Sequence, residues 1–161
     1  MNRYTVCHLV SDRELSQDDT FSSLDWPAHI TLLGSFVIDN SVDQFKANLL
    51  EIAQLVTPFS IEVGDDSLLG ENHEVLVSLV NKSSHLQGLH NNILAAALLH
   101  NAQIRNPQFT DKRYTPHITV QKTERYHSGD TLQIKDFHLI QHEPNGIKHE
   151  RQIIETYTLI Q

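Results

Sequence analysis

The chain has 161 residues, of which 39% are hydrophobic, so it can bury a sizeable core and is not composed like a disordered segment. Its formal net charge of −8 argues against a broad basic face that wraps duplex nucleic acid. No apolar stretch approaches the roughly 20 residues that cross a bilayer. A single cysteine, Cys7, excludes an internal disulfide and is compatible with a reducing cytoplasm. We therefore expect one two-lobed domain over residues 1–161, cytoplasmic and with no membrane partner.

The first half of the chain predicts several strands and one helix. The helix follows Ser41, which together with Gln44 has the form of a capping box, and Pro58 ends it. In chain order, the predicted elements are a strand at residues 4–10, a polar loop at 11–25, a strand at 28–38, a helix at 42–56, and strands at 59–63 and 75–80 joined by a turn at 64–70.

The second half repeats this plan. Ser84 and Gln87 form another candidate capping box before a helix that ends ahead of Asn106-Pro107. The remaining predicted elements are a strand at residues 117–121 and an antiparallel pair at 132–141 and 152–160, around a turn at 144–146. The two halves predict an α+β fold that is bilobal, with pseudo-two-fold antiparallel sheets, helices on the outside and a central cleft.

The tripeptide His-Ile-Thr occurs twice, at residues 29–31 and 117–119, each time inside a predicted strand. Side chains alternate between the two faces of a strand, so each copy presents a histidine and a threonine on the face opposite its isoleucine. Two such strands brought together would offer two imidazoles and two hydroxyls to one small ligand. This set of groups suits the chemistry of phosphate esters.

An ordinary solvated strand edge is the alternative explanation for any single His-x-Thr. The chain has 11 histidines, but none of the other nine is followed two residues later by threonine. The two copies also have hydrophobic neighbours in the same register, which favours a shared function for the pair.

Basic residues gather around the second copy, although the chain is acidic overall. Among them, Arg113 and Lys122 are candidates for contacting phosphate, and solvated roles are the alternative. Tyr114 and Phe109 could stack on a nucleobase or pack in the core. The basic residues of this segment are Arg105, Lys112, Arg113, Lys122 and Arg125.

The pair of H-x-T strands about half a chain apart resembles the two-histidine (2H) phosphoesterase superfamily, and in particular its LigT-like, "2'-5' RNA ligase" branch. The matching residues are His29 and Thr31 in A-H-I-T-L-L-G, and His117 and Thr119 in Y-T-P-H-I-T-V-Q-K. The resemblance implies a cleft lined by both motif strands, and metal-independent hydrolysis of cyclic phosphates or 2',5' linkages. Gln121 occupies a cleft-facing position that varies between branches, so the sequence leaves the substrate open.

The residue chemistry agrees with this expectation. A neutral imidazole would take a proton from water and an imidazolium would give one to the leaving ribose oxygen, and histidine supplies both forms near neutral pH. We expect His29 and His117 to be catalytic, in an order that the sequence does not give, and Thr31 and Thr119 to bind phosphate. Tyr114, Lys122, Arg113 and Gln121 are possible substrate contacts.

We expect the protein to act as a monomer on a small nucleotide or an RNA end with a cyclic or 2',5' phosphate, without cofactor or metal. His8 could line the cleft or be a buried structural histidine. Two alternative functions use the same residues: a nucleotide-binding module without turnover, and a 2'-5' RNA ligase that runs the chemistry in reverse.

Overall fold

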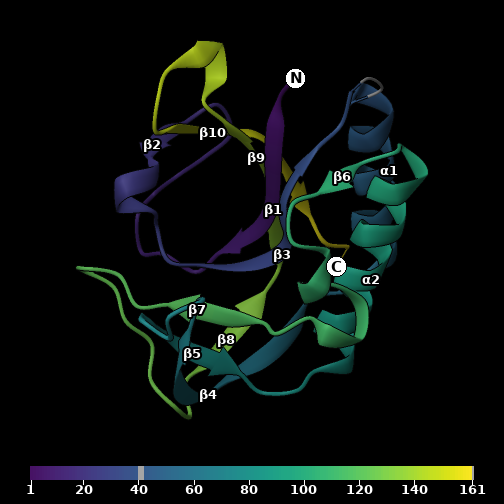
Figure 1. Cartoon of the computed structure of the whole chain (residues 1–161). Helices are drawn as coiled ribbons and strands as arrows, with labels where there is room; N and C mark the ends of the chain where they lie inside the picture. The colour runs from purple at the N-terminus through teal and green to yellow at the C-terminus, as the bar shows by residue number, and fades with distance from the viewer. Residues whose placement is uncertain (40–41, 161) are drawn as a thin grey trace.

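An antiparallel sheet with two helices packed on one of its faces makes up the computed structural model, which describes residues 1–39 and 42–160 (Figure 1). The strands are β1 (Arg3–Leu9), β2 (Thr20–Ser22), β3 (His29–Val37), β4 (Phe59–Leu69), β5 (Val75–Val80), β6 (Gln103–Ile104), β7 (His117–Thr119), β8 (Thr131–Ile134), β9 (Asp136–His142) and β10 (Glu150–Thr158). The helices are α1 (Val42–Leu55) and α2 (Ser84–Leu99), with short 3-10 turns at Ser23–Asp25, Pro107–Phe109, Asp111–Arg113 and Pro144–Gly146. No helix within the described residues is long and apolar enough to span a membrane.

The strand order divides the sheet into two halves. It runs β2-β10-β9-β1-β3-β7-β5-β4-β8, with β6 paired to β3 outside this path. The halves meet where β3 pairs with β7, with Ile30 opposite Ile118. Each half therefore ends on one of the two His-Ile-Thr strands. The predicted α+β fold with two antiparallel halves is confirmed, and the structure adds that the two motif strands are direct neighbours.

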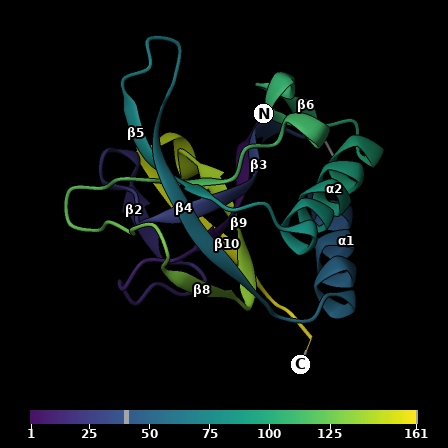
Figure 2. The same ribbon diagram turned by 90° about the horizontal axis from the view of Figure 1, so that it is seen from below.

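The core lies between the sheet and the helices, which sit side by side along the same face of the sheet (Figures 1 and 2). The alternation along β3 sends Ile30 and Leu32 into this core, where both side chains are fully buried. Phe45 of α1 and Ile93 of α2 are also fully buried there. The opposite face of β3 is left for His29 and Thr31.

The helix starts differ from their predicted caps. Ser41, the cap predicted for α1, lies outside the described residues. In α2 the cap is Ser83 rather than Ser84, because Ser83 has an extended backbone and its hydroxyl accepts a hydrogen bond from the Leu86 N–H at 3.2 Å.

Strand β4 is longer than predicted. The sequence indicates a turn over residues 64–70, but β4 continues to Leu69 and only the turn beginning at Gly70 reverses the chain. The pairing of β4 with β5 shifts register between Val63 and Asp66, so a bulge accommodates the glycine and aspartate that suggested a turn.

The predicted strand at residues 132–141 is two strands that belong to different halves of the sheet. Strand β8 pairs with β4, whereas β9 pairs with β1 and β10. The chain passes from one half to the other at Lys135, between the two strands. A continuous apolar pattern cannot show that its partners change, which explains the error. Of the antiparallel pair predicted at residues 132–141 and 152–160, the pairing is confirmed for β9 with β10.

Candidate active site

The four motif side chains lie on one face of the seam between β3 and β7. Because the strands are antiparallel and Ile30 is opposite Ile118, His29 lies opposite Thr119 and Thr31 lies opposite His117. Residues directly opposite in such a pair have Cβ atoms about 5 Å apart. The isoleucines are buried on the other face and all four motif residues are partly exposed. The structure thus brings together two imidazoles and two hydroxyls, alternating across the seam.

Both motif histidines make the same local contact. The Nδ1 atom of His29 lies 2.9 Å from the carbonyl oxygen of Pro27, and that of His117 lies 2.8 Å from the carbonyl oxygen of Thr115. A carbonyl oxygen only accepts hydrogen bonds, so each Nδ1 carries the hydrogen. In the neutral form, the proton-accepting lone pair is therefore on Nε2 of both rings.

The functional atoms of the four motif side chains have no hydrogen-bond partner in the part of the protein that the structure describes. Across residues 1–39 and 42–160, no hydrogen bond engages Nε2 of His29 or His117, or the hydroxyl of Thr31 or Thr119. These four groups are free to bind a ligand placed over the seam.

The surroundings of His29 favour its neutral form. Burial lowers its pKa below 6.5, against the effect of the Pro27 carbonyl, and the nearby charge of His117 lowers it further. The Trp26 ring packs against the imidazole, with 4.7 Å between ring centroids. The pairing of β3 with β7 places the two rings on one face of the sheet, where the charge of His117 acts on His29.

A carboxylate that the sequence did not single out holds the first motif in place. Glu124 accepts hydrogen bonds from the Ala28 N–H at 3.0 Å and the Ser11 hydroxyl at 2.8 Å through one oxygen, and from the Asp12 N–H through the other. Burial opposes ionisation of this carboxyl group, but the three hydrogen bonds and Arg13 leave its pKa below the usual value. The segment that follows the second motif thereby fixes the residue next to His29. No pattern in the sequence links Glu124 to residues some hundred positions earlier.

Tyr114, which precedes the second motif in the chain, contacts the first motif strand. Its hydroxyl donates to the carbonyl oxygen of Thr31 at 2.7 Å, and its ring stacks on that of the buried His90 at 4.0 Å between centroids. His90 in turn binds the Leu32 carbonyl and accepts from the Asp111 N–H. These contacts give Tyr114 a role within the fold, and its contact with a substrate stays a prediction.

The other residues predicted to contact the substrate lie outside the two motif strands. Arg113 and Lys122 are exposed, and Gln121 lies just beyond the end of β7, where its N–H donates to the Glu124 carbonyl. The basic segment around the second motif is also dispersed. Arg125 pairs with Asp66 on β4, whereas Arg105, just after β6, lies in a pocket with arginines from β1 and β10.

The buried histidines of β1 and β9 have structural partners. His8 is 4% exposed and its Nδ1 lies 2.7 Å from the Asp136 carbonyl oxygen, so the structural interpretation of this residue is confirmed. His138 binds the hydroxyl of Thr156. Within the described part of the chain, no three histidine, cysteine, aspartate or glutamate residues are grouped so as to hold a metal ion.

The family of the chain follows from comparison with known proteins. A two-lobed α+β fold with a duplicated H-x-T strand at its centre defines a phosphoesterase-like class, and the model of the 2'-5' RNA ligase superfamily matches residues 10–133. The protein belongs to this superfamily, and the resemblance to 2H phosphoesterases is confirmed. No curated protein sequence matches the chain.

Solved structures share the fold over nearly the whole chain. E. coli LigT complexed with 3'-AMP aligns with a TM-score of 0.65 and 14% identity, covering 99% of this chain and 99% of LigT. The protein TT0787 of Thermus thermophilus aligns with a TM-score of 0.63 and 16% identity, covering 98% and 97% of the two chains. LigT complexed with NADP+ gives a TM-score of 0.63 at 14% identity, covering 99% and 98%. At these identities the likeness establishes the fold.

Proposed function

We propose that the protein is a metal-independent phosphodiesterase that opens a 2',3'-cyclic phosphate or cleaves a 2',5' linkage at the end of a nucleotide or RNA. One observation carries this proposal: two imidazoles with the same Nδ1–carbonyl contact and unengaged Nε2 atoms share one sheet face with two unengaged hydroxyls. A ligand that sits between them meets two proton-transfer groups and two hydrogen-bond donors.

The difference in surroundings supports His29 as the base and His117 as the acid. His29, whose pKa is lowered mainly by burial, is neutral at pH 7 and acts as the general base through Nε2. In hydrolysis of a cyclic phosphate, His29 takes a proton from water as the water oxygen bonds to phosphorus. The bond from phosphorus to one ribose oxygen breaks, and protonated His117 gives its Nε2 proton to that oxygen. The product is a phosphate monoester beside a free ribose hydroxyl.

The threonines stabilise the charge that builds on phosphorus. Thr31 and Thr119 lie beside His117 and His29 across the seam, so their hydroxyls can donate to the non-bridging oxygens. Donors that are held in place before the reaction stabilise the transition state more than mobile water does. In the proposed mechanism, side chains supply both proton transfers and the charge stabilisation, and the reaction uses neither a metal nor a cofactor. We further propose that the protein works as a cytoplasmic monomer on single nucleotides or single-stranded ends.

A 2'-5' ligase is a second candidate, because the family carries that name. The same acid and base would serve the reverse reaction, in which a ribose hydroxyl rather than water attacks the cyclic phosphate. A nucleotide-binding module without turnover is the remaining alternative. Binding alone would not require two histidines with free Nε2 atoms.

A substrate panel tests the proposal. The purified chain is incubated with 2',3'-cyclic mononucleotides, a 2',5'-linked oligoadenylate and an RNA with a cyclic phosphate end, with and without EDTA. We expect turnover that EDTA leaves unchanged and that the His29→Ala and His117→Ala variants lose, while His127→Ala, an exposed histidine, keeps it. Binding of these compounds without any turnover would favour the binding module, and loss of turnover in EDTA would contradict the proton-transfer roles.

A further inference from the structure

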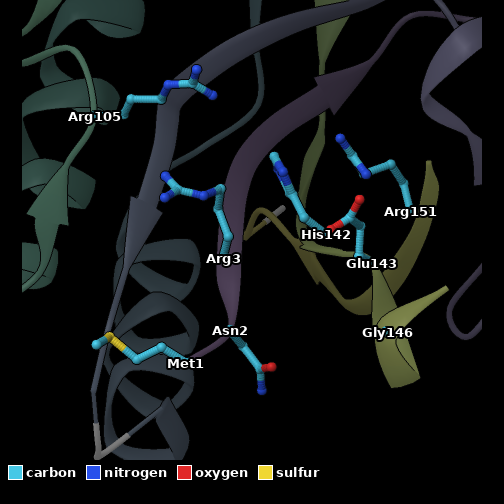
Figure 3. Close-up of a pocket in the computed structure, with 8 residues that line it drawn as sticks. All are labelled: Met1, Asn2, Arg3, Arg105, His142, Glu143, Gly146 and Arg151. Carbon is cyan, nitrogen blue, oxygen red and sulfur yellow. The ribbon is translucent and has the colours of Figure 1, made fainter. Parts of the chain in front are cut away.

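A polar pocket with a volume of about 510 Å³ lies near the N-terminal end of β1. Three arginines from different parts of the chain line it: Arg3 on β1, Arg105 after β6 and Arg151 on β10. Figure 3 shows Arg3 and Arg105 reaching in from one side and Arg151, together with His142 of β9, from the other. Such a grouping is notable in a chain with a net charge of −8 and only 12 lysines and arginines.

The positive charge of this arginine pocket is poorly compensated. Arg13 and Arg125 form ion pairs with aspartates elsewhere, but no ion pair involves Arg3, Arg105 or Arg151 within residues 1–39 and 42–160. Among the described residues, Glu143 is the one acidic residue that lines the pocket, so three guanidinium groups face a single carboxylate. Gathering like charges in this way is costly unless an anion joins them.

Hydrogen bonding within the pocket is also incomplete. The buried Nε of Arg151 has no partner among the described residues, while its Nη1 donates to the Glu150 carbonyl at 2.9 Å. Arg3 donates to the Ser35 hydroxyl at 3.0 Å, and no hydrogen bond from the Arg105 side chain is present in the same part of the chain. Several guanidinium N–H groups therefore remain available to a ligand.

The positive charge of the three arginines also acts on His142, which lines the same pocket. Burial and then the charges of Arg151, Arg3 and Arg105 lower its pKa to about 4, so the ring is neutral at pH 7. Its Nε2 lies 2.8 Å from the Thr5 hydroxyl. An anion held among the arginines would offset their charge at this ring.

The arginine pocket and the motif histidines lie on the same face of the sheet. Thr5 and Cys7 of β1 point away from the core that takes Tyr4 and Val6, and Cys7 lies opposite Thr31. The guanidinium carbon of Arg151 is 6.0 Å from the centroid of the Trp26 ring, which also packs on His29. The step of four residues along β1 from Arg3 to Cys7 spans about 13 Å, which leaves room for two separate phosphate groups.

We propose that Arg3, Arg105 and Arg151 form a second anion subsite, which binds a phosphate group of the substrate other than the one that reacts. The subsite makes a nucleotide or oligonucleotide with at least two phosphates a better substrate than a cyclic mononucleotide. Guanidinium groups suit this task because they bind phosphate oxygens with paired, charge-assisted hydrogen bonds. The link to catalysis rests on the proposed phosphodiesterase function, whereas the binding of anions does not.

Anion binding is tested without any need for turnover. NMR titration of the His142 ring is recorded for the full chain alone, with inorganic phosphate and with pyrophosphate. We expect either anion to raise the pH at which His142 titrates, and to do so far less in Arg105→Gln, which removes no described side-chain hydrogen bond. Arg125→Gln, on the other side of the seam, is the matched control and should respond like the unaltered chain. If millimolar pyrophosphate does not change the pH at which His142 titrates, the proposal is overturned.

The link to the substrate is tested by kinetics. KM is compared for a cyclic mononucleotide and for a trinucleotide with a cyclic phosphate end, in the unaltered chain, Arg105→Gln and Arg3→Gln. We expect each variant to raise KM for the trinucleotide about tenfold and to raise it less for the mononucleotide, which corresponds to loss of one charge-assisted contact. An unchanged preference for the trinucleotide, with anion binding intact, would overturn the assignment to substrate. Inactivity of the unaltered chain on both compounds would contradict the proposed function and leave the NMR result to decide the anion site.

Discussion

Strands β3 and β7 carry the same tripeptide but place it in different settings. Strand β3 has nine residues and lies between β1 and β7, whereas β7 has three and lies between β3 and β5. The imidazole of His29 packs on Trp26 and its neighbour Ala28 is held by Glu124, while the hydrogen bond made by His117 lies at an exposed position. The local sequence fixes the same ring tautomer in both strands, and burial lowers the pKa of His29 below its ordinary value.

The largest expected effect is loss of either imidazole. Replacing His29 or His117 by alanine should lower kcat/KM by about 10³-fold or more, because each removes one of two required proton transfers. The double variant should lose little more than either single one, since the pair acts as a unit. Steady-state kinetics measure this, with His127→Ala as the control. A His117→Ala variant with near-normal turnover would mean that the second motif is structural.

Loss of a motif hydroxyl should cost less. Thr31→Ala and Thr119→Ala should each lower kcat by about 10²-fold or less, because the other hydroxyl still binds the phosphate. Thr31→Ser and Thr119→Ser keep the hydroxyl and should retain most of the activity. If alanine and serine behave alike at either position, the hydroxyl does not act on the phosphate.

The effect of burial on His29 can be reduced by replacing Trp26, whose ring packs against the imidazole. In Trp26→Leu, weaker burial should let the pKa of His29 rise towards 6.5. A base that must be neutral is then protonated at higher pH, so the acidic limb of the kcat/KM profile should move to higher pH. Phe109→Leu, at an exposed aromatic residue, is the control. An acidic limb that stays in place would show that another group governs it.

The smallest effect concerns the link from Tyr114 to Thr31. Tyr114→Phe removes one hydrogen bond to the Thr31 carbonyl, which should cost about 1 kcal/mol of unfolding free energy. For a chain of this size, Tm should fall by roughly 2–4 °C in a thermal melt. Tyr157→Phe is the matched control, because the buried Tyr157 hydroxyl has no partner in the described structure and its removal should be neutral or stabilising. Equal changes in Tm for the two variants would show that the hydrogen bond from Tyr114 to Thr31 does not stabilise the fold.

The sequence predicts local elements and the motif well and long-range partners poorly. Alternation around Ile30 and Ile118 predicts that histidine and threonine share a face, because the period of a strand is fixed by its backbone. The same reasoning missed Glu124, since its hydrogen bonds to Ala28 and Asp12 depend on how distant segments meet. It also grouped Arg105 with its sequence neighbours, although its pocket partners come from β1 and β10.

The sequence also did not predict that the pairing partners of the strand change at Lys135, and the reason is related. Strands β8 and β9 read as one apolar run, because each has its own buried residues, Ile134 in one and Phe137 in the other. Hydrophobic pattern reports burial, whichever half of the sheet provides it. Strand pairing is set by the three-dimensional packing and was therefore not predictable from this pattern.

The central claim is that His29 and His117 work as one acid–base pair without metal. The pH dependence of kcat/KM, measured in EDTA on the best substrate of the panel, tests it most directly. The account predicts a bell-shaped profile in which the acidic limb reports His29 and lies below pH 6.5, because burial lowers the pKa of the base that must be neutral. A profile that rises steadily with pH, or activity that disappears in EDTA, would contradict it.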